Sequence, residues 1–440
     1  MRGQDRVPAD GGTRPAGPIR VTLTASERRR QSTVRWLAIL VTTVVTSVAV
    51  IFGARFVIGS GAATAASQTP QTVLDARAAD PATVPVKGST RFVPVGPALI
   101  LDTRGNGPVK AGADTEVPLN DLPAGASAVL AEVSIVDTTG AGDVTVDGGA
   151  GPATVLRVPR AGVQMTANAI VQIGPDRTLV LRSGGGDLLV NLVGAFQPAE
   201  TSSEGRIVTL PPSQVVKLIP KRDGKEATVQ LNDVAQLRDA GSISAVLLQV
   251  TGDVGPHGGR ISAGPVSGAM TQTLFWGPTK GADRTRVGFL AVPVTGDKVR
   301  LRYVAGTEMR ADLVGYVTGE GAPVSNAGLV VPVTPADPSE VRVTAGGDKR
   351  VAVVPETGLA EVPAGRVAAA LLSVTATGDA VGAVTAYEPG RNNAEDLTVV
   401  APKGTPRGAF ALVATKDGAV QVRSESGAAV SVAPRALVLS

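Results

Sequence analysis

Two patterns of apolar positions divide the chain. Residues 36–54 are uncharged and mostly apolar without interruption, whereas beyond residue 90 the apolar residues form short Val-rich runs that often alternate with polar ones. An unbroken apolar stretch of this length predicts a membrane-spanning helix. Alternation with a period of two, bounded by Gly, Pro, Asp and Asn, predicts β-strands. We therefore expect one N-terminal transmembrane helix followed by an all-β body.

The predicted strands are short and closely spaced. Clear examples are residues 128–136, 178–182 and 188–193, each separated from its neighbours by turn-forming residues. Past residue 90, no stretch keeps a helical period for three turns. The segment 232–240 comes closest, and we expect a short helical turn there. This spacing of strands is typical of antiparallel β-sandwiches.

The charges on either side of the apolar stretch predict its orientation. As a helix it extends about 28 Å, close to the roughly 30 Å thickness of the hydrocarbon core. Five arginines precede it closely, and Arg55 alone follows it within twenty residues. By the positive-inside rule, the N-terminus is cytoplasmic and the body lies outside the cell membrane. The alternative is a signal peptide cleaved near residues 62–66, but the apolar run is longer than such peptides use, which favours a retained single-pass anchor.

Internal repeats indicate how the body is divided. Three segments share one frame: LNDLPAGASAVL from Leu119, LNDVAQLRDAGSISAVL from Leu231 and LAEVPAGRVAAAL from Leu359. Each is followed by a Val/Thr-rich run and then by a strand that ends in proline, at Pro159, Pro278 and Pro402. Proline cannot donate to a sheet ladder, so each marks a strand end or edge. We predict three tandem antiparallel β-sandwich units at 91–200, 205–320 and 325–440.

The remaining segments complete the predicted organisation. Residues 1–35 are expected to be a disordered basic cytoplasmic tail. The transmembrane helix occupies 36–58, and the small, polar and Pro-spaced residues 59–90 form a linker.

Composition excludes several kinds of chemistry. The chain has no cysteine and one histidine, which excludes disulfides, cysteine-ligated zinc, cysteine nucleophiles and any site with two histidines. The formal net charge is +4, and residues 1–35 carry eight arginines and three acidic residues, so the rest of the chain sums to −1. A near-neutral body with few aromatic residues does not suit nucleic-acid binding. We expect no cofactor and no bound metal.

The first predicted unit resembles a known repeat. Leu101-Asp102-Thr103-Arg104, the strand entered by Pro123-Ala124-Gly125 and the segment Leu192–Phe196 are similar to the LLDTR, VPAGASAV and DVVGY segments of secreted actinobacterial proteins. With the basic tail and anchor, the chain resembles a family of actinobacterial envelope proteins of unknown activity. The resemblance implies an envelope location and an all-β ectodomain, and it implies no catalytic residues.

Four residues are candidate contact residues. Asp102 and Arg104 are charged neighbours at a predicted strand end, where a ligand contact and a local ion pair are the alternatives. Phe275 and Trp276 form an aromatic pair in a chain with only twelve aromatic residues, and they belong either to a core or to a contact patch. Asp143 and Asp147 lack the spacing of a calcium loop and are expected to form turns.

These observations favour a function without catalysis. A glycosidase needs two carboxylates in a cleft, usually with aromatic residues to hold the sugar, and the sequence supplies few of the latter. We expect a non-catalytic, membrane-anchored binding or scaffolding protein of the cell envelope, with an envelope glycan or a membrane protein as its partner. The alternatives are an accessory subunit of an envelope-biosynthesis enzyme such as a glycosyltransferase and, less favoured, a cofactor-independent hydrolase.

Overall fold

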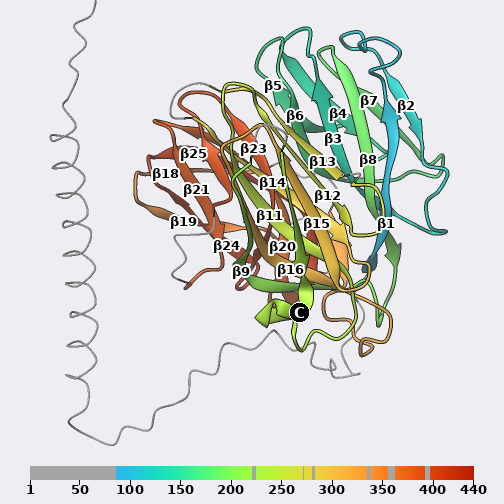
Figure 1. Cartoon of the computed structure of the whole chain (residues 1–440). Helices are drawn as coiled ribbons and strands as arrows, with labels where there is room; N and C mark the ends of the chain where they lie inside the picture. The colour runs from blue at the N-terminus through green and yellow to red at the C-terminus, as the bar shows by residue number, and fades with distance from the viewer. Residues whose placement is uncertain are drawn as a thin grey trace, which may run out of the picture. The chain divides into compact units, whose positions relative to one another are not determined.

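The computed structural model describes residues 86–220, 224–270, 272–279, 283–333, 338–354, 362–391 and 397–440. The predicted tail, the membrane segment and almost all of the linker lie outside these residues. Within the described part, no helix has both the length and the apolar character needed to cross a membrane. The same part is all-β, as the sequence predicts, and its strands form antiparallel sheets (Figure 1). Three short 3-10 turns lie between strands of this part.

The strands follow one another in three consecutive sets. The first set is β1 (Thr90–Asp102), β2 (Thr115–Pro118), β3 (Ala128–Val136), β4 (Gly142–Asp147), β5 (Ala153–Val158), β6 (Met165–Gln172), β7 (Thr178–Arg182) and β8 (Asp187–Pro198). The second set is β9 (Ile207–Leu218), β10 (Lys225–Gln230), β11 (Ile243–Asp253), β12 (Gly259–Pro265), β13 (Gln272–Trp276), β14 (Thr285–Pro293), β15 (Lys298–Val304) and β16 (Glu308–Thr318).

The third set contains one more strand than the others. It consists of β17 (Val330–Pro332), β18 (Ser339–Val343), β19 (Asp348–Ala352), β20 (Val367–Gly378), β21 (Gly382–Tyr387), β22 (Val399–Ala401), β23 (Arg407–Ala414), β24 (Ala419–Ser424) and β25 (Ala428–Leu439). The 3-10 turns are η1 (Leu231–Asp233) and η2 (Ala235–Leu237) before β11, and η3 (Ala364–Arg366) before β20. The helical turn expected near 232–240 is thus present as η1 and η2.

The strand order is the same in all three sets. The inner sheets run β6-β3-β8-β1, β14-β11-β16-β9 and β23-β20-β25, with β17 and β18 both on the far edge of β25. The outer sheets run β2-β7-β4-β5, β10-β15-β12-β13 and β19-β24-β21-β22. Pro159, Pro278 and Pro402 each follow the strand at the same end of the outer sheet. Single residue pairs, Trp276 with Met165 and Thr90 with Val330, connect neighbouring sets.

The pairing register repeats as well. The ladders β3–β8, β11–β16 and β20–β25 each shift at an equivalent position: after Leu130 in β3, after Leu247 in β11 and after Leu371 in β20. The second and third of these ladders also shift once more near the start of β11 and of β20. A shift of this kind is a bulge, which bends the strand and increases its twist.

Alternation along the strands builds four apolar cores. In β3, for example, Val129, Ala131 and Val133 face the outer sheet of the first set, while Ala128 and Leu130 face the opposite way. Each set has its own core between its inner and outer sheets. A fourth core, which we call the central core, takes residues from all three inner sheets, among them Leu130, Leu247 and Leu371.

Candidate functional site

The predicted charged pair lies at the end of β1. Arg104 donates from Nε to Asp102 Oδ1 at 2.9 Å and from Nη2 to Oδ2 at 2.6 Å. The hydrogen bond from Arg104 holds the pKa of Asp102 below its usual range, although partial burial opposes the effect. The two side chains satisfy each other two residues apart, so the geometry favours the local ion pair over a ligand site.

The predicted aromatic pair is split between the two faces of β13. Trp276 is buried in the core of the second set, where its ring meets the ring of Tyr303 edge to face at a centroid distance of 6.3 Å. Phe275 is half-buried on the other face, and its backbone N–H donates to Thr166 Oγ1 of β6 at 2.8 Å. Trp276 is therefore a core residue, and Phe275 takes part in a contact between the first and second sets.

A buried carboxylate lies at this same contact. Glu132 of β3 is fully buried on the face that carries Leu130, and it accepts hydrogen bonds at Oε1 from Asn191 Nδ2 (2.7 Å) and from the backbone N–H of Thr273 (3.0 Å). Its Oε2 atom has no hydrogen-bond partner. Burial raises the pKa of Glu132 to about 7, and the two hydrogen bonds only partly oppose this. Glu132 thus connects the first and second sets.

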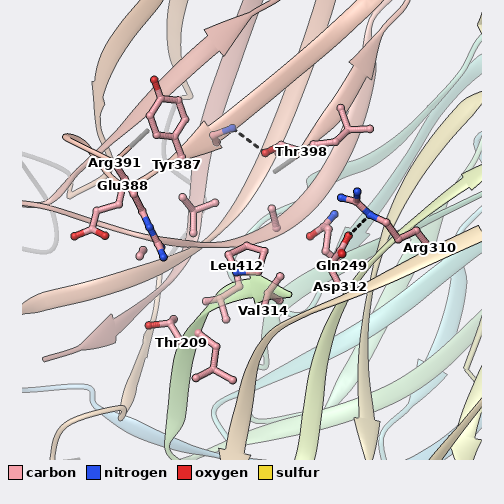
Figure 2. Close-up of a pocket in the computed structure, with 17 residues that line it drawn as sticks. Thr209, Gln249, Arg310, Asp312, Val314, Tyr387, Glu388, Arg391, Thr398 and Leu412 are labelled. Atoms are coloured by element: carbon pink, nitrogen blue, oxygen red, sulfur yellow. Dashed lines mark hydrogen bonds and ion pairs between the residues drawn. The ribbon is translucent and has the colours of Figure 1, made fainter. Parts of the chain in front are cut away.

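A small cavity separates strands of the second and third sets (Figure 2). Gln249, Arg310 and Asp312 lie on one side of it, and Glu388 and Arg391 on the other. Asp312 accepts from Arg310 Nε at 2.7 Å. The cavity has a volume of about 60 Å³, far below the roughly 300–1,000 Å³ of typical ligand pockets. Although it contains two carboxylates, it offers no room for a sugar or peptide substrate.

Three junctions join the sets in the same way around the central core. At each one, the edge strand of an inner sheet (β6, β14 or β23) approaches the edge strand of an outer sheet (β13, β22 or β5, respectively) of another set. Strand pairing between Trp276 and Met165 closes the β6–β13 junction.

A charge cluster closes the β14–β22 junction. Arg407 at the start of β23 donates from both terminal nitrogens to the two Asp283 carboxylate oxygens, each at 2.6 Å. Arg286 Nη1 lies 3.3 Å from the same carboxylate. Burial raises the pKa of Asp283, but the hydrogen bonds and charges of the two arginines outweigh it and hold that pKa below its usual range.

The third junction is open. Between β5 and β23 lies a groove of about 790 Å³, which we call the open groove. One wall is formed by residues 152–157 and 165–168 of the first set. The floor belongs to the third set and includes alternate residues of β20 and β25, together with residues 340–342 of β18. The groove falls in the size range of binding pockets.

Hydroxyl groups and arginines give the open groove its chemistry. Ser373, Thr375 and Thr377 point into it because the intervening Val374 and Ala376 of β20 face the core of the third set. Thr154, Thr166 and Ser431 add further hydroxyls. These side chains can donate and accept hydrogen bonds without bringing a fixed charge.

Among the arginines that line the open groove, Arg435 is the one for which the described residues provide no partner. Arg157 and Arg342 also line it, but they lie 4.0 Å from Asp143 and close to Asp379, respectively. Arg435 is half-buried, and within the part of the chain that the structure describes no carboxylate pairs with it. Burial lowers its pKa, yet a guanidinium remains charged in proteins. A half-buried, unpaired guanidinium is well placed to bind a carboxylate or phosphate.

The predicted site residues and the open groove do not coincide. None of Asp102, Arg104, Phe275 and Trp276 lines the groove or the cavity of Figure 2. Sequence reasoning missed Glu132 and Arg435, although each interrupts an otherwise apolar run. Asp147 forms a turn, as expected, by accepting from the backbone N–H groups of Gly149 and Gly151. The same expectation is wrong for Asp143, which lies within β4 with Oδ1 4.0 Å from Arg157 Nε. Among the described residues, no cluster of three His, Cys, Asp or Glu could hold a metal ion.

Comparison with solved structures yields only distant likenesses, among them two chains from archaeal viruses. No family model matches the sequence, and no curated protein matches it. A chain from the atomic structure of Sulfolobus Turreted Icosahedral Virus has 11% identity and a TM-score of 0.17, over 80% of this chain and 91% of that one. A chain described with the triple jelly roll fold and turret assembly in an archaeal virus has 10% identity and a TM-score of 0.17, over the same shares. These scores are too low to support any conclusion about this chain.

Proposed function

We propose that the protein is a non-catalytic, membrane-anchored binding or scaffolding protein of the cell envelope. Its body would consist of three tandem β-sandwich units, one for each set of strands, with the N-terminus in the cytoplasm and the body outside. Each unit would be a jelly roll, the sandwich of eight strands in two four-stranded sheets. The shared strand order and the shared bulge position support the three-unit organisation.

The open groove is the observation that carries the binding function. It is large enough for a ligand, whereas the cavity between the second and third sets is not. Its hydroxyl groups can form hydrogen bonds with a ligand, and the unpaired guanidinium of Arg435 can bind an anionic group. A small number of such polar groups is typical of binding sites. Glu340 is the single acidic residue among its lining residues, so the groove lacks the pair of carboxylates that a glycosidase would need.

Blocking the groove tests this proposal. The full-length chain, purified in detergent micelles, is incubated with cell-wall polymer and with solubilised membrane proteins of a cell envelope. We expect Thr375→Trp, which places an indole in the groove, to reduce recovery of the bound component at least about tenfold. Thr228→Trp is the matched control, because Thr228 is an exposed strand residue of β10 that does not line the groove.

Two results would contradict the proposal. If the wild-type chain and Thr375→Trp recover equal amounts of the bound component, the open groove is not the binding site. A hydrolytic activity that disappears on substitution of one Asp or Glu would show that the protein is an enzyme. Recovery of a membrane-bound glycosyltransferase with the wild-type chain would instead identify the protein as an accessory subunit of that enzyme.

A further inference from the structure

The open groove lies between two unpaired strand edges. β23 pairs with β20 on one side, and β5 pairs with β4 on one side. Among the described residues neither strand has a ladder partner on its other side, and both contribute residues to the groove. An unpaired edge presents a row of backbone N–H and C=O groups, which is a template for pairing with another strand.

The β6–β13 junction shows how such a strand edge pairs with another strand in this fold. At the β6–β13 junction, β13 pairs with β6 through Trp276 and Met165. Gln164 Nε2 also donates to the Trp276 carbonyl at 3.3 Å, and the backbone N–H of Phe275 donates to Thr166. The edge of β6 therefore holds an extended polypeptide in the position where the edge of β23 faces the groove.

We propose that the open groove binds an extended polypeptide segment of a partner protein, which pairs with the free edge of β23 or β5 and places a carboxylate on Arg435. This inference rests on the proposed function and specifies its ligand. Addition of a strand to a sheet edge is a general mode of peptide recognition, in which main-chain hydrogen bonds supply affinity and side-chain contacts supply specificity. The guanidinium of Arg435 supplies specificity because it can hold a carboxylate through two parallel hydrogen bonds.

The lining residues favour a peptide over a glycan. Phe410 is the one aromatic residue in the groove lining, and its side chain is 3% exposed. The groove thus has no open ring face on which a sugar could lie. Ser373, Thr375 and Thr377 instead follow β20 at the two-residue spacing with which the side chains of an extended peptide alternate.

Peptide selection on the full-length chain tests the inference. A phage-displayed library of random twelve-residue peptides is panned on the chain in detergent micelles and counter-selected on Arg435→Ala. We expect the enriched peptides to alternate β-branched and polar residues and to carry Asp or Glu at one fixed position. The best peptide, synthesised, should bind at least about tenfold more weakly to Arg435→Ala. Arg423→Ala, an exposed arginine of β24 outside the groove, should bind it normally.

Two measurements separate strand addition from simple charge attraction. The peptide should slow hydrogen exchange of backbone amides in residues 153–157 or 407–414. Replacing its central residue with proline, which cannot donate to a ladder, should abolish binding, whereas replacing its acidic residue with the amide should only weaken it.

Three outcomes would overturn the inference. The first is a failure to enrich acidic, extended peptides. The second is Arg435-dependent binding of the probe oligogalacturonic acid without peptide binding, which would leave the proposed envelope-binding function in place with a glycan as ligand. The third is strong protection, in the full-length chain alone, of those amides of 153–157 and 407–414 that do not bond to β4 or β20, which would mean that another segment of the same chain already pairs with these edges.

Discussion

At the scale of single residues, Glu132 is the main exception to the apolar pattern. Burying a charged carboxylate without full hydrogen bonding costs free energy. Burial therefore favours the neutral form of Glu132 and raises its pKa to about 7. The two bonds that Glu132 accepts come from β8 and from β13, so one side chain ties together strands of two sets. This position gives its ionisation a direct effect on stability.

Glu132 makes stability fall as the pH rises. Its folded pKa, about 7, exceeds the ordinary value of 4.5, so the folded state binds more protons than the unfolded state between these values. Its contribution is therefore full below about pH 4.5 and is lost as the pH rises through 7, by on the order of 3 kcal/mol. Glu132→Gln keeps both accepted hydrogen bonds and should remove this dependence. Urea denaturation midpoints at pH 5 and pH 8 measure it.

The control for this prediction is Glu116→Gln, because Glu116 is an exposed residue of β2. That variant should keep the wild-type difference between the two pH values. A pH dependence in Glu132→Gln equal to that of the wild type would show that other groups titrate in this range.

At the scale of strands, the sequence Leu-Val-Gly occurs in β8 at residues 192–194 and in β16 at residues 313–315, and in both places the glycine lies against a neighbouring strand. A Cβ atom on Gly194 of β8 would lie 2.2 Å from Cζ of Phe92, whose ring packs over this backbone in the central core. In β16, a Cβ atom on Gly315 would lie 2.6 Å from the Val208 carbonyl oxygen. The glycine in both motifs thus permits close contact with β1 or β9.

Gly194→Ala should destabilise the protein by about 1–3 kcal/mol, because the added methyl must displace the Phe92 ring in a packed core. Gly105→Ala is the matched control: a Cβ atom there would meet no atom within 4 Å, and the backbone does not require a positive φ. Thermal unfolding of both variants, followed by circular dichroism, measures the difference. Equal melting temperatures for the two variants would mean that Phe92 moves aside without cost.

The sequence predicts where individual strands lie along the chain better than it predicts which strands lie beside one another in space. Alternation in residues 128–136 shows which residues of β3 share a face, but it does not show that Leu130 meets Leu247 and Leu371. Glu132 and Arg435 are visible as lone charges in apolar runs, yet their roles depend on which strand edges approach each other. The open groove has no local sequence signal, because it results from the separation of β5 and β23, which are far apart along the chain.

At the scale of the whole described body, the central core couples the three sets of strands. It contains phenylalanines from each set, such as Phe196, Phe289 and Phe410, and the last two pack edge to face at a centroid distance of 5.4 Å. No set can expose its inner sheet without exposing apolar residues of the other two. Burial of apolar surface is the dominant stabilising term in folding, so we expect the sets to support one another.

A pair of leucine substitutions in the first set tests this coupling. Leu130 belongs to the central core, whereas Leu179 is fully buried in the core of the first set alone. Each change to alanine should cost about 2–5 kcal/mol. Leu130→Ala should speed hydrogen exchange not only in β3 but also in β11 and β20, because its cavity opens onto all three inner sheets. Leu179→Ala should act mainly on β2, β4 and β7. Exchange measured by mass spectrometry on the full-length chain distinguishes these patterns, and an effect of Leu130→Ala confined to the first set would mean that the sets fold independently.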